Sequence, residues 1–307
     1  MSLMKLADLP EKPIRPHAFF SLPSRFVDVA RRNRSTSIRI HYKEAGTGAP
    51  ILLVHGLMTS AYSFRYLIPL LAPHGRVIVP DLPGAGESDA PTDLSMAPDT
   101  IAEVLAAFIT ALDLGPTHVV GNSLGGYESL WLAATHPDRV RRLTIIHAPG
   151  FPHAKLRLVQ LGMSLPGAAA LFRRLVTKDP ETFVAKNVHY HDPRTMSLEE
   201  ARLYGAIFRD AARTEVFRRI LRESLSISKM NELHARIREI RSNGEPLPLT
   251  RLLWARHDVM VPAAFGEKYK ALLPDADLVW LDDVSHFMHV DDPERTAAAI
   301  LAPDIPA

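Results

Sequence analysis

The chain has 307 residues, which is enough for one large domain with an insertion or for two domains. Its 36 Lys and Arg residues against 34 Asp and Glu residues leave it nearly neutral, which argues against a nucleic-acid-binding protein with a basic surface. It has no cysteine, so disulfides, thiolate metal sites and a cysteine nucleophile are excluded.

The N-terminal segment is polar and rich in proline. Residues 1–16 contain several charged side chains and no unbroken apolar stretch, unlike a signal peptide. No apolar run in the chain approaches the ~20 residues of a membrane helix. We therefore expect a cytoplasmic protein with no membrane span. The three prolines within 10–16 favour an extended arm, which would lie across the surface or reach a neighbouring subunit of a homo-oligomer.

The first half of the chain alternates strand and helix patterns. Residues 25–30 and 37–42 alternate apolar and polar side chains, as antiparallel strands with one exposed face do. Continuous apolar runs separated by helical spacing follow, and such runs are typical of parallel strands covered on both faces. These strands are expected at 51–54, 77–79, 117–120 and 143–146, and the helices at 60–72, 101–112 and 127–135. Right-handed crossovers between them predict a doubly wound α/β sheet.

The alternation is interrupted once. Residues 151–245 have helical spacing without a convincing strand. They carry 17 basic and 11 acidic side chains, whereas the rest of the chain carries 19 and 23, so we treat them as a separate unit. The earlier pattern resumes with strands at 249–255 and 278–281 and helices at 263–273 and 293–301. We predict a mostly parallel sheet of about eight strands, with an N-terminal arm at 1–24, a core at 25–150 and 246–307, and an inserted helical cap at 151–245.

Ser123 is the most informative residue of the chain. It lies in Gly121-Asn122-Ser123-Leu124-Gly125-Gly126, between a predicted strand and a predicted helix. A nucleophile elbow needs this arrangement, because small residues two positions before and after the serine let backbone segments approach closely. A helix that starts there directs free N–H groups, including that of Leu124, toward a developing oxyanion.

The partners of a serine nucleophile are expected in loops at the carboxyl edge of the sheet. His286 follows the last predicted strand and is our candidate for the general base; His289 is its main competitor, although packing at the start of the last helix suits it better. Asp258 follows another strand and is our candidate for the orienting acid, giving the chain order Ser, Asp, His. The structural alternative for Asp258 is a helix N-cap three or four positions before Pro262, and the residue could have both roles. We interpret His147 as a strand-end or packing residue.

A second oxyanion donor is expected from the loop after the strand at 51–54. This loop reads His55-Gly56-Leu57-Met58, and Gly56 allows it to turn tightly. We predict that the N–H of Leu57 faces that of Leu124.

Four separated motifs occur in order: His55-Gly56, the turn at 81–89, the elbow at Ser123, and the Asp258 and His286 pair. With them the chain resembles the α/β-hydrolase superfamily across about residues 25–301. Its segment 55–65 looks like that of haloalkane dehalogenases and epoxide hydrolases, which carry an aspartate at the position of Ser123. The dehalogenases also carry a halide-binding tryptophan at the position of Leu124. The elbow itself is similar to that of carbon–carbon bond hydrolases of aromatic degradation, which usually carry tryptophan at the position of Phe287.

Three functions remain open at this point. The leading one is a serine hydrolase that cleaves an ester, thioester or lactone through an acyl-enzyme, with no metal and no organic cofactor. The second is a carbon–carbon bond hydrolase of a vinylogous diketone. The third is a ligand-binding protein with little turnover. The presence of a complete set of Ser123, Asp258 and His286 counts against it.

The predicted cap is expected to select the substrate. Apolar side chains at helical spacing could line a pocket over Ser123, although each one singly is more often part of a core. These cap residues are Leu156, Leu158, Leu161, Met163, Leu165, Leu171, Phe172, Leu175 and Val176. The floor of the pocket is expected to consist of Met58, Phe151, Met260 and Phe287. We therefore expect a hydrophobic small-molecule substrate.

Overall fold

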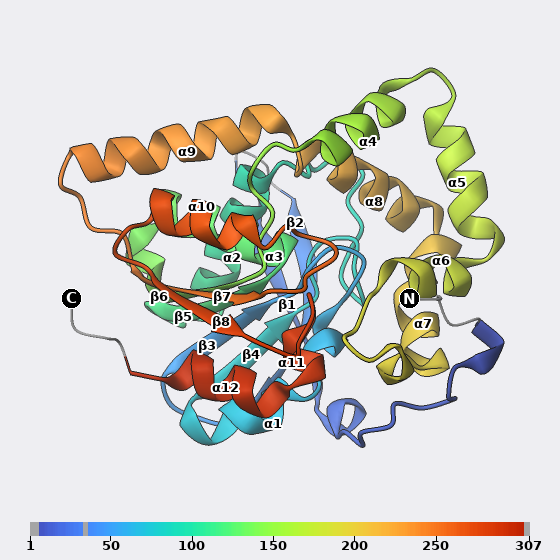
Figure 1. Ribbon diagram of the computed structural model, residues 1–307, viewed down its shortest axis with the longest axis horizontal. Helices are drawn as coiled ribbons and strands as arrows, with labels where there is room; N and C mark the ends of the chain where they lie inside the picture. Colours follow the sequence, from blue (N-terminus) through green and yellow to red (C-terminus); the bar gives the residue numbers. More distant parts are fainter. Residues whose placement is uncertain (1–5, 33–35, 304–307) are drawn as a thin grey trace.

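A computed structural model describes residues 6–32 and 36–303, except for the side chains of four residues in one helix, and it has an eight-stranded sheet at its centre (Figure 1). The strands lie in the order β1-β2-β4-β3-β5-β6-β7-β8. Only β2 pairs antiparallel with its neighbours β1 and β4; the other pairs are parallel. The strands are β1 (Ser24–Ala30), β2 (Ser37–Ala45), β3 (Pro50–Val54), β4 (Arg76–Pro80), β5 (Thr117–Asn122), β6 (Val140–Ile146), β7 (Leu249–Ala255) and β8 (Asp277–Leu281). The predicted doubly wound, mostly parallel sheet is confirmed.

Both faces of the central strands are apolar, as the continuous hydrophobic runs predicted. In β3, Leu52 and Val54 belong to one buried cluster, whereas Ile51 and Leu53 belong to the other. This follows from the two-residue period of a strand, which turns successive side chains to opposite faces. The sheet therefore needs a layer of helices on each side.

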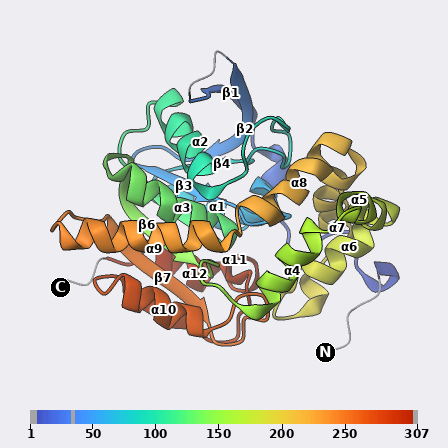
Figure 2. The same ribbon diagram turned by 90° about the horizontal axis from the view of Figure 1, so that it is seen from above.

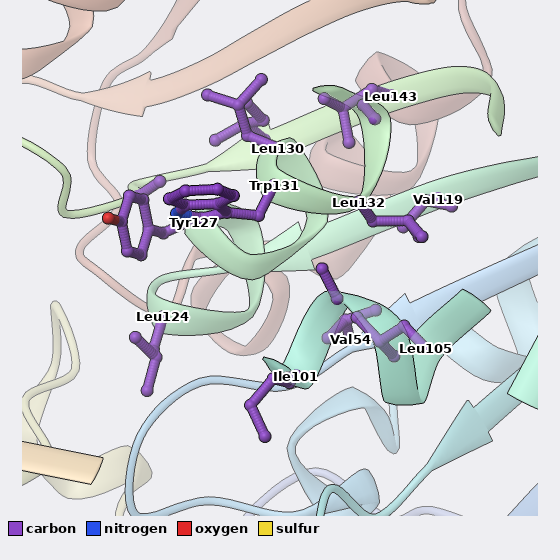
Figure 3. Close-up of a cluster of buried hydrophobic side chains, with 14 of the residues drawn as sticks. Val54, Ile101, Leu105, Val119, Leu124, Tyr127, Leu130, Trp131, Leu132 and Leu143 are labelled. Atoms are coloured by element: carbon purple, nitrogen blue, oxygen red, sulfur yellow. The ribbon is translucent and has the colours of Figure 1, made fainter. Parts of the chain in front are cut away.

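Two groups of helices cover these faces (Figures 1 and 2). One face carries α2 (Pro98–Ala111), α3 (Leu124–Thr135), α9 (Ile227–Ser242) and α10 (Ala264–Leu272). The other carries α1 (Leu67–Leu71), α11 (Met288–Asp291) and α12 (Pro293–Leu301). Figure 3 shows part of the first layer, where Leu132 of α3 lies beside Val119 of the sheet and Leu105 of α2 lies beside Val54. The helix that begins beside Ser123 is thus anchored by a buried core.

The single helix predicted over 60–72 is wrong in detail. The segment folds as a short 3-10 turn, the five-residue helix α1 and a second 3-10 turn. Pro69 and Pro73 explain the breaks, because proline has no backbone N–H to donate to the preceding turn. The 3-10 turns of the described chain are Leu6–Asp8, Phe19–Ser21, Ala61–Phe64, Ala72–His74, Pro137–Arg139, Pro193–Thr195 and Ala206–Arg209.

The segment between β6 and β7 is helical and divides into two parts. Its helices before α9 are α4 (Ala154–Ser164), α5 (Ala168–Lys178), α6 (Pro180–Asn187), α7 (Leu198–Gly205) and α8 (Ala211–Glu223). They gather beyond the carboxyl ends of the strands (Figure 1). In contrast, α9 packs against α3 and α10, and its Met230, Leu233 and Ile237 belong to a core cluster of the sheet. We therefore keep the word cap for α4–α8.

The cap and the N-terminal arm are tied to the core by buried polar contacts. Arg65 of the core and Glu200 of α7 form a fully buried ion pair, with Arg65 Nη1 3.0 Å from Glu200 Oε1. The Tyr62 hydroxyl donates to Glu199 at 2.6 Å and lies 3.0 Å from a ring nitrogen of His17 in the arm. Removing one partner of a buried ion pair typically costs about 3–5 kcal/mol of folding free energy, because the other charge is left buried and unpaired, so Arg65 and Glu200 depend on each other across this junction.

The sequence predicts no membrane span. Among residues 6–32 and 36–303, no helix combines the length and apolar composition needed to cross a bilayer.

Burial of His118 in β5 makes stability depend on pH. Its Nε2 lies 2.9 Å from the Thr144 hydroxyl, and desolvation, with nearby arginines, lowers the pKa of His118 to about 3. The unfolded chain, with a histidine pKa of about 6.5, therefore binds the proton first. The stabilisation is complete above pH ~6.5 and falls by about 1.4 kcal/mol per pH unit as the pH drops toward 3.

We expect His118→Gln to reduce this dependence, because glutamine can still hydrogen-bond Thr144 but does not titrate. Between pH 7 and pH 5, the wild-type free energy of unfolding should fall by about 2 kcal/mol more than that of the variant. Urea unfolding at both pH values measures the difference. Equal acid sensitivity of the two proteins would contradict the assignment.

Candidate active site

The turn at Ser123 has the backbone of a strained elbow. Ser123 joins β5 to α3 with φ 55° and ψ −124°, a backbone conformation that residues other than glycine rarely adopt. The elbow is also crowded: a Cβ on Gly125 would lie 2.4 Å from the carbonyl oxygens of Val54 and His55. The glycine two residues after the serine is therefore required for the close approach of the two backbone segments.

His286 and Asp258 are in direct contact at the carboxyl edge of the sheet. Asp258 lies in the loop after β7 and His286 in the loop after β8, and His286 Nδ1 is 2.7 Å from Asp258 Oδ2. An ionised carboxylate only accepts hydrogen bonds, so Nδ1 carries the proton and Nε2 is left as the basic nitrogen. The other oxygen, Asp258 Oδ1, accepts the N–H groups of Met260 and Val261. Asp258 thus orients the imidazole and caps its own turn.

A second imidazole reaches the same carboxylate. His147, at the end of β6, has its Nε2 3.2 Å from the N–H of Ala255, so its proton sits on Nδ1. That Nδ1 lies 3.0 Å from Asp258 Oδ2, but away from the linear geometry of a strong hydrogen bond. Our interpretation of His147 as a packing residue was therefore incomplete. The sequence gives no local signal for this contact, because a histidine at a strand end can have many roles and only the fold brings it to Asp258.

The charge state of this cluster follows from its surroundings. Burial alone would raise the pKa of Asp258, but the charge of His286, its hydrogen bond and the close polar contact of His147 lower that pKa far below the usual range. Desolvation lowers the pKa of His147. At neutral pH the site therefore holds a buried carboxylate beside a neutral His147.

The same three residues have potential metal-ligand atoms within 4.8 Å of one another. However, the 2.7 Å between His286 Nδ1 and Asp258 Oδ2 is the length of a charge-assisted hydrogen bond. Two atoms that bind one zinc ion at ~2.0 Å would lie about 3.3 Å apart. The geometry therefore favours a shared proton between these atoms.

Ser123 and His286 line one cavity of about 330 Å³. Among the described residues the Ser123 hydroxyl has no hydrogen-bond partner. In structures without substrate, the distance between a nucleophile and its base is often longer than a hydrogen bond. The two residues are nevertheless linked, because Asn122 Nδ2 donates to the carbonyl of His286 at 3.1 Å. Sequence reasoning missed this role of Asn122, which has no motif of its own beyond its place beside the serine.

The loop that carries Leu57 is held with its N–H free. The carbonyl of Gly56 accepts from His55 Nδ1 at 2.9 Å and from the Thr59 hydroxyl at 3.0 Å. Because a trans peptide turns its C=O and N–H in opposite directions, the N–H of Leu57 points away from these groups. A Cβ on Gly56 would lie 3.0 Å from that of Ser123, so this peptide adjoins the serine. Neither Leu57 nor Leu124 donates its backbone N–H to another residue of the described chain.

The four residues expected on the pocket floor, Met58, Phe151, Met260 and Phe287, all line the cavity. The expected cap residues mostly do not. Leu156 lines the cavity, but Leu158, Leu161, Leu165, Leu171 and Leu175 are exposed, whereas Phe172 and Val176 are buried within the cap. The cap instead contributes Phe183, Asn187, Phe217, Leu221 and Leu225 from α6, α8 and the turn after α8. Helical spacing identifies apolar faces but does not tell which of them faces the pocket.

Gly125→Ala should prevent the elbow from forming, because the new Cβ would clash with two backbone carbonyl groups. We expect a drop of several degrees in Tm, or loss of soluble protein. The matched control is Gly162→Ala in α4, where no described atom outside the helix's own backbone lies within 4 Å of the new Cβ and alanine favours the helix. Equal Tm values for the two variants, measured by thermal unfolding, would show that the close approach is unimportant.

His147→Asn and His147→Ala should differ in activity. Asn places an N–H donor near the position of Nδ1 and tolerates the φ of 50° at this residue, whereas Ala leaves Asp258 without that contact. We expect kcat to fall about tenfold in the alanine variant, with a shifted acidic limb of its pH profile, and much less in the asparagine variant. If both variants lose activity equally with unshifted profiles, His147 serves packing alone.

The family comparison agrees with this geometry. A family model described as "alpha/beta hydrolase fold" matches residues 49–293. "Haloalkane dehalogenase 2" of Mycobacterium tuberculosis is 31% identical over 268 residues, covering 86% of this chain and 90% of that protein. The "2-hydroxy-6-oxononadienedioate/2-hydroxy-6-oxononatrienedioate hydrolase" of Burkholderia vietnamiensis is 28% identical over 289 residues, covering 92% and 95%.

Solved structures share the fold at low sequence identity. The epoxide hydrolase CorEH superimposes with a TM-score of 0.74 at 21% identity, covering 91% of this chain and 98% of that one. An esterase from Thermogutta terrifontis gives a TM-score of 0.68 at 22% identity, covering 90% and 96%. Together with the elbow at Ser123 and the eight-stranded sheet, these matches show that the chain belongs to the α/β-hydrolase family and is a hydrolase of that fold.

Proposed function

We propose that this hydrolase cleaves an ester, thioester or lactone of a hydrophobic small molecule through an acyl-enzyme on Ser123. The observation that carries the proposal is the orientation of His286: its Nδ1 is bound to the buried Asp258 carboxylate, which leaves Nε2 as the base in the cavity that Ser123 also lines. No metal and no organic cofactor takes part in this reaction.

In the proposed first step, the Ser123 oxygen attacks the substrate carbonyl while His286 Nε2 takes its proton. The N–H groups of Leu57 and Leu124 stabilise the oxyanion of the tetrahedral intermediate, each worth about 3 kcal/mol of the barrier. His286 then returns the proton to the leaving alkoxide or thiolate. Asp258 stays ionised and stabilises the imidazolium that exists between these transfers.

Water completes the cycle in the second step. His286 takes a proton from water, the resulting hydroxide attacks the acyl carbonyl, and Ser123 leaves with that proton. The apolar lining by Met58, Phe151, Met260 and Phe287 supports a hydrophobic acyl or aromatic group, because burying such a group is favourable by about 25 cal/mol per Å².

The residues argue against the reaction named for the dehalogenase relative. The dehalogenases that the sequence resembles use an aspartate nucleophile and a halide-binding tryptophan, where this chain has Ser123 and Leu124. The serine is suited to acyl transfer instead.

The second candidate is cleavage of a carbon–carbon bond in a vinylogous diketone. It is favoured by the 28% identity with the Burkholderia hydrolase over 289 residues and by the elbow at Ser123, which resembles that of carbon–carbon bond hydrolases. Phe287 replaces the tryptophan usual in the resembling enzymes, which counts against it.

Ser123→Ala should lower the kcat for p-nitrophenyl esters by at least ~10⁴-fold without changing the fold, because the nucleophile is removed from an otherwise intact site. It should also abolish labelling by a fluorophosphonate probe. Ser242→Ala at the end of α9 is the matched control and should behave as wild type. Turnover that survives Ser123→Ala would reject the serine mechanism.

The bond type is tested with the wild-type enzyme and two substrate panels, esters of rising acyl chain length and dienol diketones. We expect a kcat/KM that rises with apolar chain length until the cavity is filled. A dienol substrate with a higher kcat/KM than every ester would favour the carbon–carbon hydrolase. Tight binding of a small molecule with no product from either panel would favour a ligand-binding protein.

A further inference from the structure

Leucines are unusually exposed on one helical hairpin of the cap. In α4 and the turn after it, Leu158, Leu161 and Leu165 are 70%, 64% and 59% exposed. In α5, Leu171 and Leu175 are 60% and 61% exposed. These five residues are nearly half of the eleven strongly exposed large hydrophobic residues in the described chain. Apolar surface concentrated in this way usually marks an interaction site.

The exposed leucines do not lie on the side of the hairpin that faces the core. Phe172 and Val176 of α5 are buried, and the ring of Phe172 stacks on that of Phe217 in α8 at 6.0 Å. Leu171 and Leu175 are each one position earlier, about 100° around the helix from this buried stripe. Both Figures 1 and 2 place α5 at the outer edge of the molecule. The helix therefore has a second apolar stripe that no described residue covers.

Charged residues of one sign accompany the leucines. Arg157, Arg173, Arg174 and Lys178 are exposed, and none of them forms an ion pair with another described residue. Residues 154–178 contain no Asp or Glu. We call the five leucines and these four cations the leucine–cation face.

We propose that the leucine–cation face docks on an anionic lipid bilayer. Two features hold amphipathic helices on such a surface: apolar side chains that enter the boundary of the acyl chains, and cations that lie at the headgroups. The leucines and the cations of this face supply both. A second copy of this chain is a poorer occupant, because the same face opposite itself would bring four cations against four. Leu156, in the first turn of α4, lines the cavity beside Ser123, so docking would hold the cavity near apolar molecules dissolved in the membrane.

The test is cosedimentation of the full chain with vesicles of phosphatidylcholine and phosphatidylglycerol, with pure phosphatidylcholine vesicles for comparison. We expect binding to the anionic vesicles only, weakened by added salt. Leu171→Ser with Leu175→Ser should weaken binding at least tenfold, and Arg173→Gln with Arg174→Gln about 25-fold, since each surface charge contributes about fivefold.

Matched controls lie elsewhere on the surface. Leu249→Ser changes a leucine that is 59% exposed at the start of β7, and Arg141→Gln changes an exposed arginine of β6. Both should bind vesicles as wild type does. All variants should keep the wild-type Tm and the wild-type turnover of a water-soluble ester without vesicles, so vesicle binding is scored independently of the proposed hydrolysis.

Three results would overturn the proposal. The first is a wild-type protein that does not sediment with anionic vesicles at low salt, or that binds neutral vesicles equally well. The second is undiminished binding by both double variants. The third is a dimer, seen by sedimentation velocity without lipid, that the leucine variant dissociates; the face would then belong to a second copy of the chain.

Discussion

The site depends on one buried negative charge. The side chain of Asp258 is fully buried, and its carboxylate lies between the imidazoles of His147, which follows β6, and His286, which follows β8. An unpaired carboxylate here would cost several kcal/mol, so the two histidines must approach it whenever the chain is folded. The same contacts that make the charge tolerable bring the ends of β6, β7 and β8 together. The stability of the folded sheet edge and the orientation of His286, the proposed base, therefore have a common origin.

The sheet was predictable because its signal is local, whereas the site was predictable only in part. All eight strands appear as apolar or alternating runs, and the family motifs imply Ser123, Asp258 and His286. The second imidazole, His147, was missed because a histidine at a strand end has many roles, and only the fold brings it to Asp258. The exposed leucines of α4 and α5 were expected in the pocket for a similar reason. An amphipathic period identifies a face, but its partner depends on tertiary packing.

The cap is joined to the core at a place that limits its freedom. Arg65 and Glu200 form a buried ion pair across the boundary, and the arm passes the same junction through His17 and Tyr62. Moving the cap as a rigid lid would separate buried charges and is therefore expensive. Access to the cavity is easier through rearrangement of α4, α6 and α8, whose side chains form its upper lining.

Four residues in the loops at the carboxyl ends of the strands, Met58, Ser123, His147 and Asp283, have positive φ, at 64°, 55°, 50° and 59°. Each conformation costs of order 1–3 kcal/mol and persists only while the surrounding packing enforces it. The rim thus has a built-in tendency to relax that the described strands, which contain no residue with positive φ, do not share. As packing loosens on warming or in mild denaturant, this edge should be the first region to lose its geometry, so catalytic competence would disappear while the central strands still protect their amide protons from exchange.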